Sequence, residues 1–502
     1  MTPQTLLTKS RYVMGLNCKK AIWLAFNNPS ELPKVDEAMQ HRFDEGHKVG
    51  ELSKSLFPEG IEVNERIPAE NDKKSKELLK KRKPLFEAGF MHEDGKCYAR
   101  ADILIPVGKN EWDIIEVKSA SEVKEEYFQD ISFQKYCYES AGLKIRKCFV
   151  LHINGEYVRK GKVEAKEFFV QAEITEEIED LMPSVPEKIT TLLNIINLKR
   201  CPEISKGEDY HEDDYKVHDN DLFWKEHPEC DILDLYYGGK KAIELFNAGT
   251  LCIKDMAEED FTSRPQKKQQ KIQHKATTTG ECYQDKKELT TFIKSLKYPL
   301  YFMDFETYAT AIPLYDGLKP YQAIPFQFSV HVIAKEGSKP QHHSFIASGS
   351  DDPRIKFTAE LKEALSEQGT ILVYYQPFEK SRLKEIAEFF PENTEWVESV
   401  FKRIMDLYDP FKNFAYYHPA QKGSASLKKV LPALTGKSYD GMDIDNGNLA
   451  SIEYLFITHG AFDGKKATPA EVQKVRDDLE KYCGQDTEGM VWILDKLKEI
   501  VK

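Results

Sequence analysis

The chain has 502 residues, of which 41% are hydrophobic and 31% are charged, and its formal net charge is −12. This length predicts two or three domains with sizeable cores, and no stretch approaches the about 18 apolar residues of a membrane span. An acidic balance argues against a protein that coats nucleic acid by bulk attraction. It does not exclude a metal-dependent nuclease, whose carboxylates can coexist with a local basic groove.

The amino terminus and the cysteines indicate where the protein works. The opening MTPQTLLTKSRYVMGLNCKK lacks the apolar core of a signal peptide. The nine cysteines are scattered without a pairing pattern, which is typical of a reducing compartment. We therefore expect a cytoplasmic protein that does not associate with membranes.

Residues 1–200 alternate helical and strand-like patterns and form the first expected domain. An amphipathic helix is expected over residues 38–57. Two strands, over 99–107 and 111–120, are joined by a short turn at Gly108–Asn110. A helix over 121–141 and a strand over 146–154 follow.

Residues 201–285 are expected to connect two domains. An acidic polar run at 206–221 comes first. The apolar runs around Gly238 and Gly239 fit a small helical hairpin that grips a phosphate backbone through loop amides, or a plain helical linker. The basic stretch 264–280 has few apolar residues and predicts an exposed linker or loop.

Residues 286–502 carry a second α/β pattern. Strands are expected over 298–308, 325–334 and 369–376, and a helix over 378–390. Thr468 and Pro469 are a good helix start, and that helix has a candidate break near Gly484. The expected fold class is α/β throughout, in two domains.

A first group of polar residues lies on the two strands joined at Gly108–Asn110. Asp102 is on the first strand and Glu116 on the second, and Lys118 shares a face with Glu116. Carboxylates on adjacent strands can hold a hard divalent cation that lowers the pKa of bound water, and an adjacent lysine can stabilise the phosphorus centre. A solvated surface pair is the alternative reading of Glu116 and Lys118.

The ordered set resembles the RecB-type branch of the PD-(D/E)XK nuclease superfamily. On the helix after the Glu-x-Lys motif, Gln134 and Tyr138 match its Gln-x-x-x-Tyr motif, and His47 matches its early histidine. The likeness covers roughly residues 5–160, including LTKSRYVMGLNCKKAIWL. It implies that His47, Asp102 and Glu116 bind metal, that Lys118 positions water and phosphate, and that Gln134 and Tyr138 order substrate.

One departure concerns an iron–sulfur cluster. Many RecB-type relatives hold such a cluster through one early cysteine and three clustered late ones. Cys18 fits the early position, but only Cys201 and Cys230 follow, far apart. We therefore expect no iron–sulfur cluster and interpret Cys18 as a packed thiol.

A second group of carboxylates lies in the last 200 residues. Asp304 and Glu306 share one face at the end of a strand, and Glu379 follows another strand. Tyr482 and Asp486 lie one turn apart on the late helix. Carboxylates brought together in this way can hold two Mg²⁺ or Mn²⁺ ions for in-line phosphodiester hydrolysis. Asp406 is a weaker candidate for the same site.

This group resembles the DEDD exonucleases of the RNase H-like fold, in the class whose last motif is Tyr-x-x-x-Asp. The likeness covers about residues 298–495, and it implies 3′→5′ action, metal binding by Asp304, Glu306, Glu379 and Asp486, and a role for Tyr482 near the attacking water. The family usually has Asp where Glu379 stands. With PYQAIPFQFSVHVI and GSASLKKVLPAL, the whole chain resembles an uncharacterised bacterial family that joins the two modules.

We therefore expect a metal-dependent nuclease that acts on DNA, with a RecB-type domain at 1–200 and a DEDD exonuclease domain at 286–502. Two alternatives stay open. One is a ribonuclease, and the other is a nucleic-acid-binding protein in which one domain has lost catalysis. Nucleic acid is the expected partner, and the sequence names no protein partner.

Overall fold

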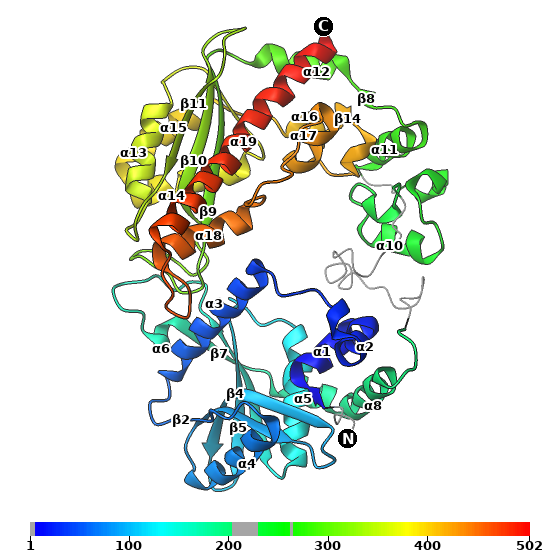
Figure 1. Ribbon diagram of the computed structural model, residues 1–502, viewed down its shortest axis with the longest axis vertical. Helices are drawn as coiled ribbons and strands as arrows, with labels where there is room; N and C mark the ends of the chain where they lie inside the picture. The colour runs from blue at the N-terminus through cyan, green and yellow to red at the C-terminus, as the bar shows by residue number, and fades with distance from the viewer. Residues whose placement is uncertain (1–5, 203–228, 262–264) are drawn as a thin grey trace. The chain divides into compact units, whose positions relative to one another are not determined.

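The computed structural model describes residues 6–202, 229–261 and 265–502 (Figure 1). These residues form two compact units. The first comprises residues 6–202 together with Thr310–Gln322, and the second comprises residues 229–309 and 323–502. The acidic run predicted at 206–221 lies outside the described residues. Both units are mixed α/β structures.

The first unit is built on a seven-stranded sheet with the order β2-β3-β4-β5-β6-β7 and β1 added beside β4. Its strands are β1 (Leu7–Thr8), β2 (Ile61–Glu62), β3 (Leu85–Met91), β4 (Cys97–Val107), β5 (Glu111–Lys118), β6 (Lys144–Ile153) and β7 (Phe169–Glu173). The hairpin predicted at Gly108–Asn110 is confirmed, because β4 and β5 pair antiparallel on either side of that turn.

Apolar side chains project from both faces of this sheet, and each face contributes to one hydrophobic core. Leu104 and Ile114 belong to the core that contains α1, α5 and α8, and Ile103 and Ile115 to a core that includes Val49 of α3. The helices are α1 (Lys9–Asn17), α2 (Lys19–Asn27), α3 (Glu37–Lys54), α4 (Pro68–Leu78), α5 (Glu126–Ser140), α6 (Ala165–Phe168), α7 (Thr175–Leu181) and α8 (Val185–Ile196).

The second unit contains a five-stranded sheet with the order β11-β10-β9-β12-β13. Its first three strands pair antiparallel, and β12 and β13 add in parallel to β9. The strands are β9 (Leu300–Tyr308), β10 (Ile324–Ile333), β11 (Gln341–Ile346), β12 (Thr370–Val373) and β13 (Ile404–Asp406), and a separate ribbon pairs β8 (Tyr283–Gln284) with β14 (Tyr416–Tyr417). The expected strands over 298–308 and 325–334 are confirmed.

Helices cover both faces of the five-stranded sheet (Figure 1). One core holds Phe357, Leu383 and Val397 of α13, α14 and α15, and α18 and α19 pack on the strands from the other side. The helices of this unit are α10 (Gly239–Asn247), α11 (Lys267–Thr279), α12 (Lys286–Ser295), α13 (Arg354–Ala364), α14 (Pro377–Phe389), α15 (Thr394–Phe401), α16 (Asp409–Lys412), α17 (Leu427–Thr435), α18 (Gly447–His459) and α19 (Pro469–Val501).

Two expectations about the segment before the second sheet are wrong. The stretch expected to be an exposed linker forms α11, because Gln270 and Gln273 are fully buried and bind the backbone of Tyr236. The sequence showed no cysteine pairing, yet Cys230 and Cys252 form a disulfide. For the apolar runs around Gly238 and Gly239, a helical hairpin and a plain helical linker were both open, and the structure has one helix there, α10, flanked by short 3₁₀ turns.

The last helix, α19, is continuous from Pro469 to Val501. Thr468 caps it, as predicted, by accepting the N–H of Glu471. The expected break near Gly484 is absent, because buried residues on both sides of that glycine hold the helix against the sheet. None of the helices in the described ranges is long and apolar enough to cross a membrane.

Candidate active sites

The first candidate site lies where β4 and β5 separate. Their pairing ends at Ile103 and Ile115, and the next residues toward the open end are Asp102 and Glu116. There the Asp102 carboxylate accepts the Val117 backbone N–H at 2.7 Å. The side chain replaces a strand-to-strand bond, which fixes it beside Glu116.

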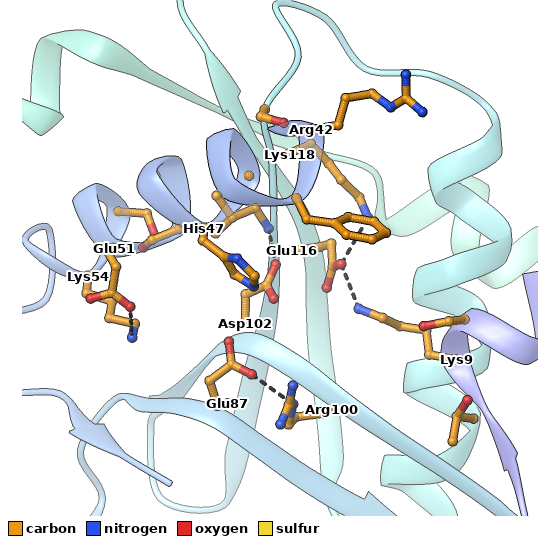
Figure 2. Close-up of a pocket in the computed structure, with 18 of the residues that line it drawn as sticks. Lys9, Arg42, His47, Glu51, Lys54, Glu87, Arg100, Asp102, Glu116 and Lys118 are labelled. Atoms are coloured by element: carbon orange, nitrogen blue, oxygen red, sulfur yellow. Dashed lines mark hydrogen bonds and ion pairs between the residues drawn. The ribbon is translucent and has the colours of Figure 1, made fainter. Parts of the chain in front are cut away.

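Figure 2 shows Glu116 at the centre of a network of charged and polar side chains. Its Oε1 accepts hydrogen bonds from Lys118 Nζ at 2.9 Å and from Lys9 Nζ at 2.7 Å. Its Oε2 accepts one from Gln134 Nε2 at 2.6 Å. Lys118 also donates to Asp130 at 2.6 Å. The predicted neighbours Glu116, Lys118 and Gln134 are therefore in contact.

The charges around this network set the protonation of its two main carboxylates. Burial and the nearby Glu116 carboxylate raise the pKa of Asp102 to about 7. Burial alone would also raise the pKa of Glu116, but Lys118 and Lys9 outweigh it and hold that pKa below its usual value. Glu116 is therefore ionised at neutral pH, whereas Asp102 titrates near neutrality.

The other predicted residues of this site take different places. His47 lies on α3, and Figure 2 shows its ring directed toward Asp102. Tyr138 is fully buried and does not line the cavity. Its hydroxyl donates to the Ala88 carbonyl and accepts the Ala101 N–H at 2.7 Å. Tyr138 thereby links β3 to β4 and positions Asp102. Its place in the core does not suggest direct contact with a substrate.

A cavity of about 650 Å³ opens over these residues. Asp102, Glu116, Lys118 and His47 all line it. Further cationic side chains at its wall are Lys9, Arg42, Lys54, Arg66 and Arg100. Acidic side chains also line the cavity, and two of them, Glu51 and Glu87, pair with Lys54 and Arg100. The cavity therefore combines carboxylates with a larger number of cationic groups.

Two residues of this site were not predicted from the sequence. Glu87 on β3 lies in register with Asp102, between the pairs Phe86–Ile103 and Ala88–Ala101. It lines the cavity and contacts Arg100 at 2.8 Å. The sequence could have indicated Glu87, because it is an acidic residue inside the otherwise apolar strand LFEAGFM. Lys9 gave no signal, because it is 107 residues from Glu116.

The second candidate site lies between β9 and α19. Asp304 and Glu306 point to the same face of β9, and Asp486 comes from the facing helix. One oxygen of Asp304, one of Glu306 and the Sγ of Cys483 lie within 4.8 Å of one another. Burial, and then the charge of Asp486, raise the pKa of Asp304. Burial and Asp304 likewise raise the pKa of Glu306.

Two tyrosines lie near Asp486. Tyr439 donates its hydroxyl to Asp486 Oδ1, and Tyr482 lies one turn before Asp486 on α19. Burial and the charge of Asp486 raise the pKa of both tyrosines, so both stay protonated. Lys428 Nζ lies 5.4 Å from the Tyr482 ring centroid. Tyr439, Lys428 and Cys483 were not predicted as site residues.

Glu379 completes this site from the first turn of α14. It is 1% exposed, and its Oε2 has no hydrogen-bond partner among the described residues. Burial and the charge of Asp304 raise its pKa well above the usual value. An ionised carboxylate in such surroundings needs a cation. The residue that departs from the DEDD pattern is thus buried within range of the charge of Asp304.

Asp406, the weaker candidate for this site, is held by backbone groups. Its Oδ1 accepts the backbone N–H groups of Tyr375 at 2.9 Å and Tyr408 at 3.0 Å, and its Oδ2 accepts that of Gln376 at 2.8 Å. Both oxygens are engaged with the chain. Asp406 therefore shapes the turn between β12 and α14 that presents Glu379.

The cysteines of the first unit bear on the expected absence of an iron–sulfur cluster. Cys18 is buried, and its Sγ accepts the Ala21 N–H at the start of α2. Cys201 packs against the same small core. The packed-thiol interpretation of Cys18 agrees with this geometry, and the expectation about the cluster stays a prediction.

Comparisons with known proteins match parts of the chain. A family model described as Domain of unknown function (DUF2779) matches residues 301–426, which include Asp304, Glu306 and Glu379. An uncharacterized protein of Mycoplasma pneumoniae is 26% identical over 227 residues, covering 41% of this chain and 33% of that protein. One of Ureaplasma parvum is 29% identical over 241 residues, covering 44% and 34%. The chain thus spans about a third of the length of these relatives.

Proposed function

We propose that the protein is a divalent-metal-dependent nuclease with two phosphodiester-cleaving sites. The observation that carries the proposal is the group of four carboxylates in the second unit, of which Glu306, Glu379 and Asp486 are buried and Asp304 is half-buried. Among them, Glu379 Oε2 has no hydrogen-bond partner in the described structure. Buried acids without cations are costly to keep ionised. Asp304, Glu306, Glu379 and Asp486 offer the hard oxygen ligands that Mg²⁺ and Mn²⁺ prefer.

The chemistry of each group follows from its contacts. A bound divalent ion supplies an acidified water and neutralises charge on the phosphate. Tyr439 holds Asp486 by donating a hydrogen bond to it, and Tyr482 lies one turn away on the same helix. The order of the five-stranded sheet is compatible with an RNase H-like fold, and the resemblance to DEDD enzymes supports 3′→5′ exonuclease action at this site.

The first unit supports a second, RecB-type site. Asp102, Glu116 and His47 would hold metal there, and the buried Gln134 Oε1 has no partner in the described structure, so it can accept from a bound water. Lys118 lies where it can orient a phosphate oxygen at the cavity floor. The basic wall of the cavity favours a polyanionic strand, with DNA as the proposed substrate.

A cleavage assay tests the proposal. End-labelled single-stranded DNA, duplex DNA and RNA are incubated with Mg²⁺ or Mn²⁺, using wild type, Lys118→Ala, Asp304→Asn and the double variant. We expect each single variant to lose a different activity by at least about 100-fold, Asp304→Asn losing release of nucleotides from the 3′ end. Preferred cleavage of RNA would favour the ribonuclease alternative.

Controls use residues of the same type outside the sites. Lys124→Ala and Asp495→Asn change side chains that are 52% and 59% exposed, and both should leave cleavage unchanged. A wild-type protein that cleaves none of the three substrates with either metal would contradict the proposal. If only one site variant loses activity, the other unit is a binding platform.

A further inference from the structure

Two exposed tyrosines of the second unit have an unusual backbone conformation. Tyr237 is 61% exposed with φ +48°, and Tyr375 is 54% exposed with φ +77°. A left-handed conformation is rare for a bulky residue, and such strain persists where the surroundings enforce it. Resting on the proposed function, we propose that Tyr237, Tyr375 and Tyr408 form a stacking platform that leads single-stranded nucleic acid to the Asp304 site.

Two of the three rings, those of Tyr375 and Tyr408, are direct neighbours, and Tyr237 is linked to them through Tyr236 and Lys412. The Tyr375 and Tyr408 ring centroids are 5.8 Å apart, with the rings perpendicular. Tyr237 packs edge-on against Tyr236, whose hydroxyl donates to the Lys412 carbonyl at 3.1 Å.

The platform is joined to the carboxylate site through Asp406. That side chain accepts the backbone N–H groups of both Tyr375 and Tyr408, so the two rings start from a rigid turn. Glu379 lies four residues after Tyr375, in the first turn of α14, and its charge interacts with that of Asp304. A strand that stacks on the platform would follow this connection toward the carboxylates.

Charged groups of both signs lie near the rings. Lys412 Nζ lies 5.8 Å from the Tyr408 ring centroid, and Asp409 follows Tyr408 directly in the chain. Exposed aromatic rings beside a lysine fit unpaired bases joined by phosphates, because every base can stack and the backbone is anionic. Paired bases are stacked on each other and do not offer their faces. The platform is therefore specific for single strands.

The test measures binding without cleavage. Fluorescein-labelled dT and rU 12-mers and a blunt DNA duplex are titrated with protein in EDTA, and anisotropy gives Kd. The variant Tyr237→Asn/Tyr375→Asn removes the rings, and Asn tolerates the left-handed conformation. We expect it to weaken single-strand binding about tenfold or more and to leave duplex binding unchanged, and the dT and rU arms separate DNA from RNA.

Two controls define the cause. Tyr237→Phe/Tyr375→Phe keeps both rings and should bind single strands as wild type does. Phe462→Ala removes an exposed ring elsewhere, on the connection between α18 and α19, and should also bind as wild type does. Unchanged affinity in the Asn variant, equal loss in the Phe variant, or no single-strand binding by wild type would overturn the platform. Ring-dependent binding by a protein that cleaves nothing would support the platform and contradict the nuclease proposal.

Discussion

At the scale of single residues, Glu379 makes a prediction about pH. We expect the second unit of the metal-free protein to lose stability as pH rises from about 4 toward 8, and Glu379→Gln to reduce that loss. The measurement is the melting temperature in EDTA at several pH values, with and without Mn²⁺. Because metal ions replace protons as the partners of these acids, Mn²⁺ should stabilise wild type more at pH 8 than at pH 5.

The sign follows from the direction of the pKa shifts. Burial raises the pKa of Asp304, Glu306 and Glu379 above their values in the unfolded chain, and that of Asp486 to about 7. Between the unfolded and folded pKa values the folded protein binds more protons, so its free energy of unfolding falls as pH rises. Equal pH slopes in wild type and Glu379→Gln would contradict this explanation.

Tyr138 provides a second prediction at the residue scale. Tyr138→Phe leaves the Ala101 N–H and the Ala88 carbonyl without a partner inside the core. We expect the free energy of unfolding of the first unit to fall by about 1–3 kcal/mol, with cleavage per folded molecule nearly unchanged. Denaturant unfolding measures this change. Tyr136→Phe on the same helix is the control, and a large loss of substrate affinity without destabilisation would restore the substrate-ordering role.

The local motifs of the first site could be predicted because adjacent strands and one helical turn bring their residues together. Asp102, Glu116 and Lys118 are of this kind. Lys9 and Glu87 were missed, because contact between Lys9 and Glu116 depends on how α1 packs beside β5. The motif placed Gln134 and Tyr138 on one face of α5 and implied that both order substrate. In the structure the Tyr138 hydroxyl instead bonds the backbone of Ala88 and Ala101, because β3 and β4 pack against that part of α5.

At the scale of elements, Gly484 tests why α19 does not break. Glycine costs about 0.5–1 kcal/mol relative to alanine inside a helix. A Cβ at Gly484 would meet its nearest atom, His342 Cε1, at 3.5 Å, an ordinary contact. Gly484→Ala should therefore raise the free energy of unfolding by about 0.5–1 kcal/mol, measured in denaturant.

Gly489, one turn further along α19, is the matched control. Its Cβ would lie 3.1 Å from Leu431 Cδ2, so Leu431 has to move before alanine fits. Gly489→Ala should stabilise less than Gly484→Ala or destabilise. Equal stabilisation by both would show that packing at these positions does not limit the helix. The predicted break failed because sequence reasoning weighed the glycine without the sheet that supports the helix.

The element α11 shows the same limit in the opposite direction. Its sequence is basic and polar, which predicted a linker. The buried face is polar too: Gln270 and Gln273 bind the backbone around Tyr236 in place of an apolar contact. Such a face shows no hydrophobic periodicity in the sequence. The helix can therefore be recognised only when the segment it packs against is known.

At the scale of the whole molecule, the chain is organised as two compact units, each with its own sheet and its own group of carboxylates. The alternation of strands and helices predicted the α/β class of both. One connection was not foreseen: Thr310–Gln322, between β9 and β10, belongs to the first unit. There Arg159 Nη1 donates to the Pro313 carbonyl at 2.7 Å. The domain predicted at 286–502 was a continuous range, so it could not include a segment that belongs to the other unit.

The central claim is that the chain holds divalent cations at two separate groups of carboxylates. Electron paramagnetic resonance of free Mn²⁺ counts the ions bound by wild type, Glu116→Gln, Asp304→Asn and the double variant. We predict that each single variant loses a different part of the bound Mn²⁺ and that the double variant binds almost none. Equal Mn²⁺ binding by wild type and the double variant would contradict the account.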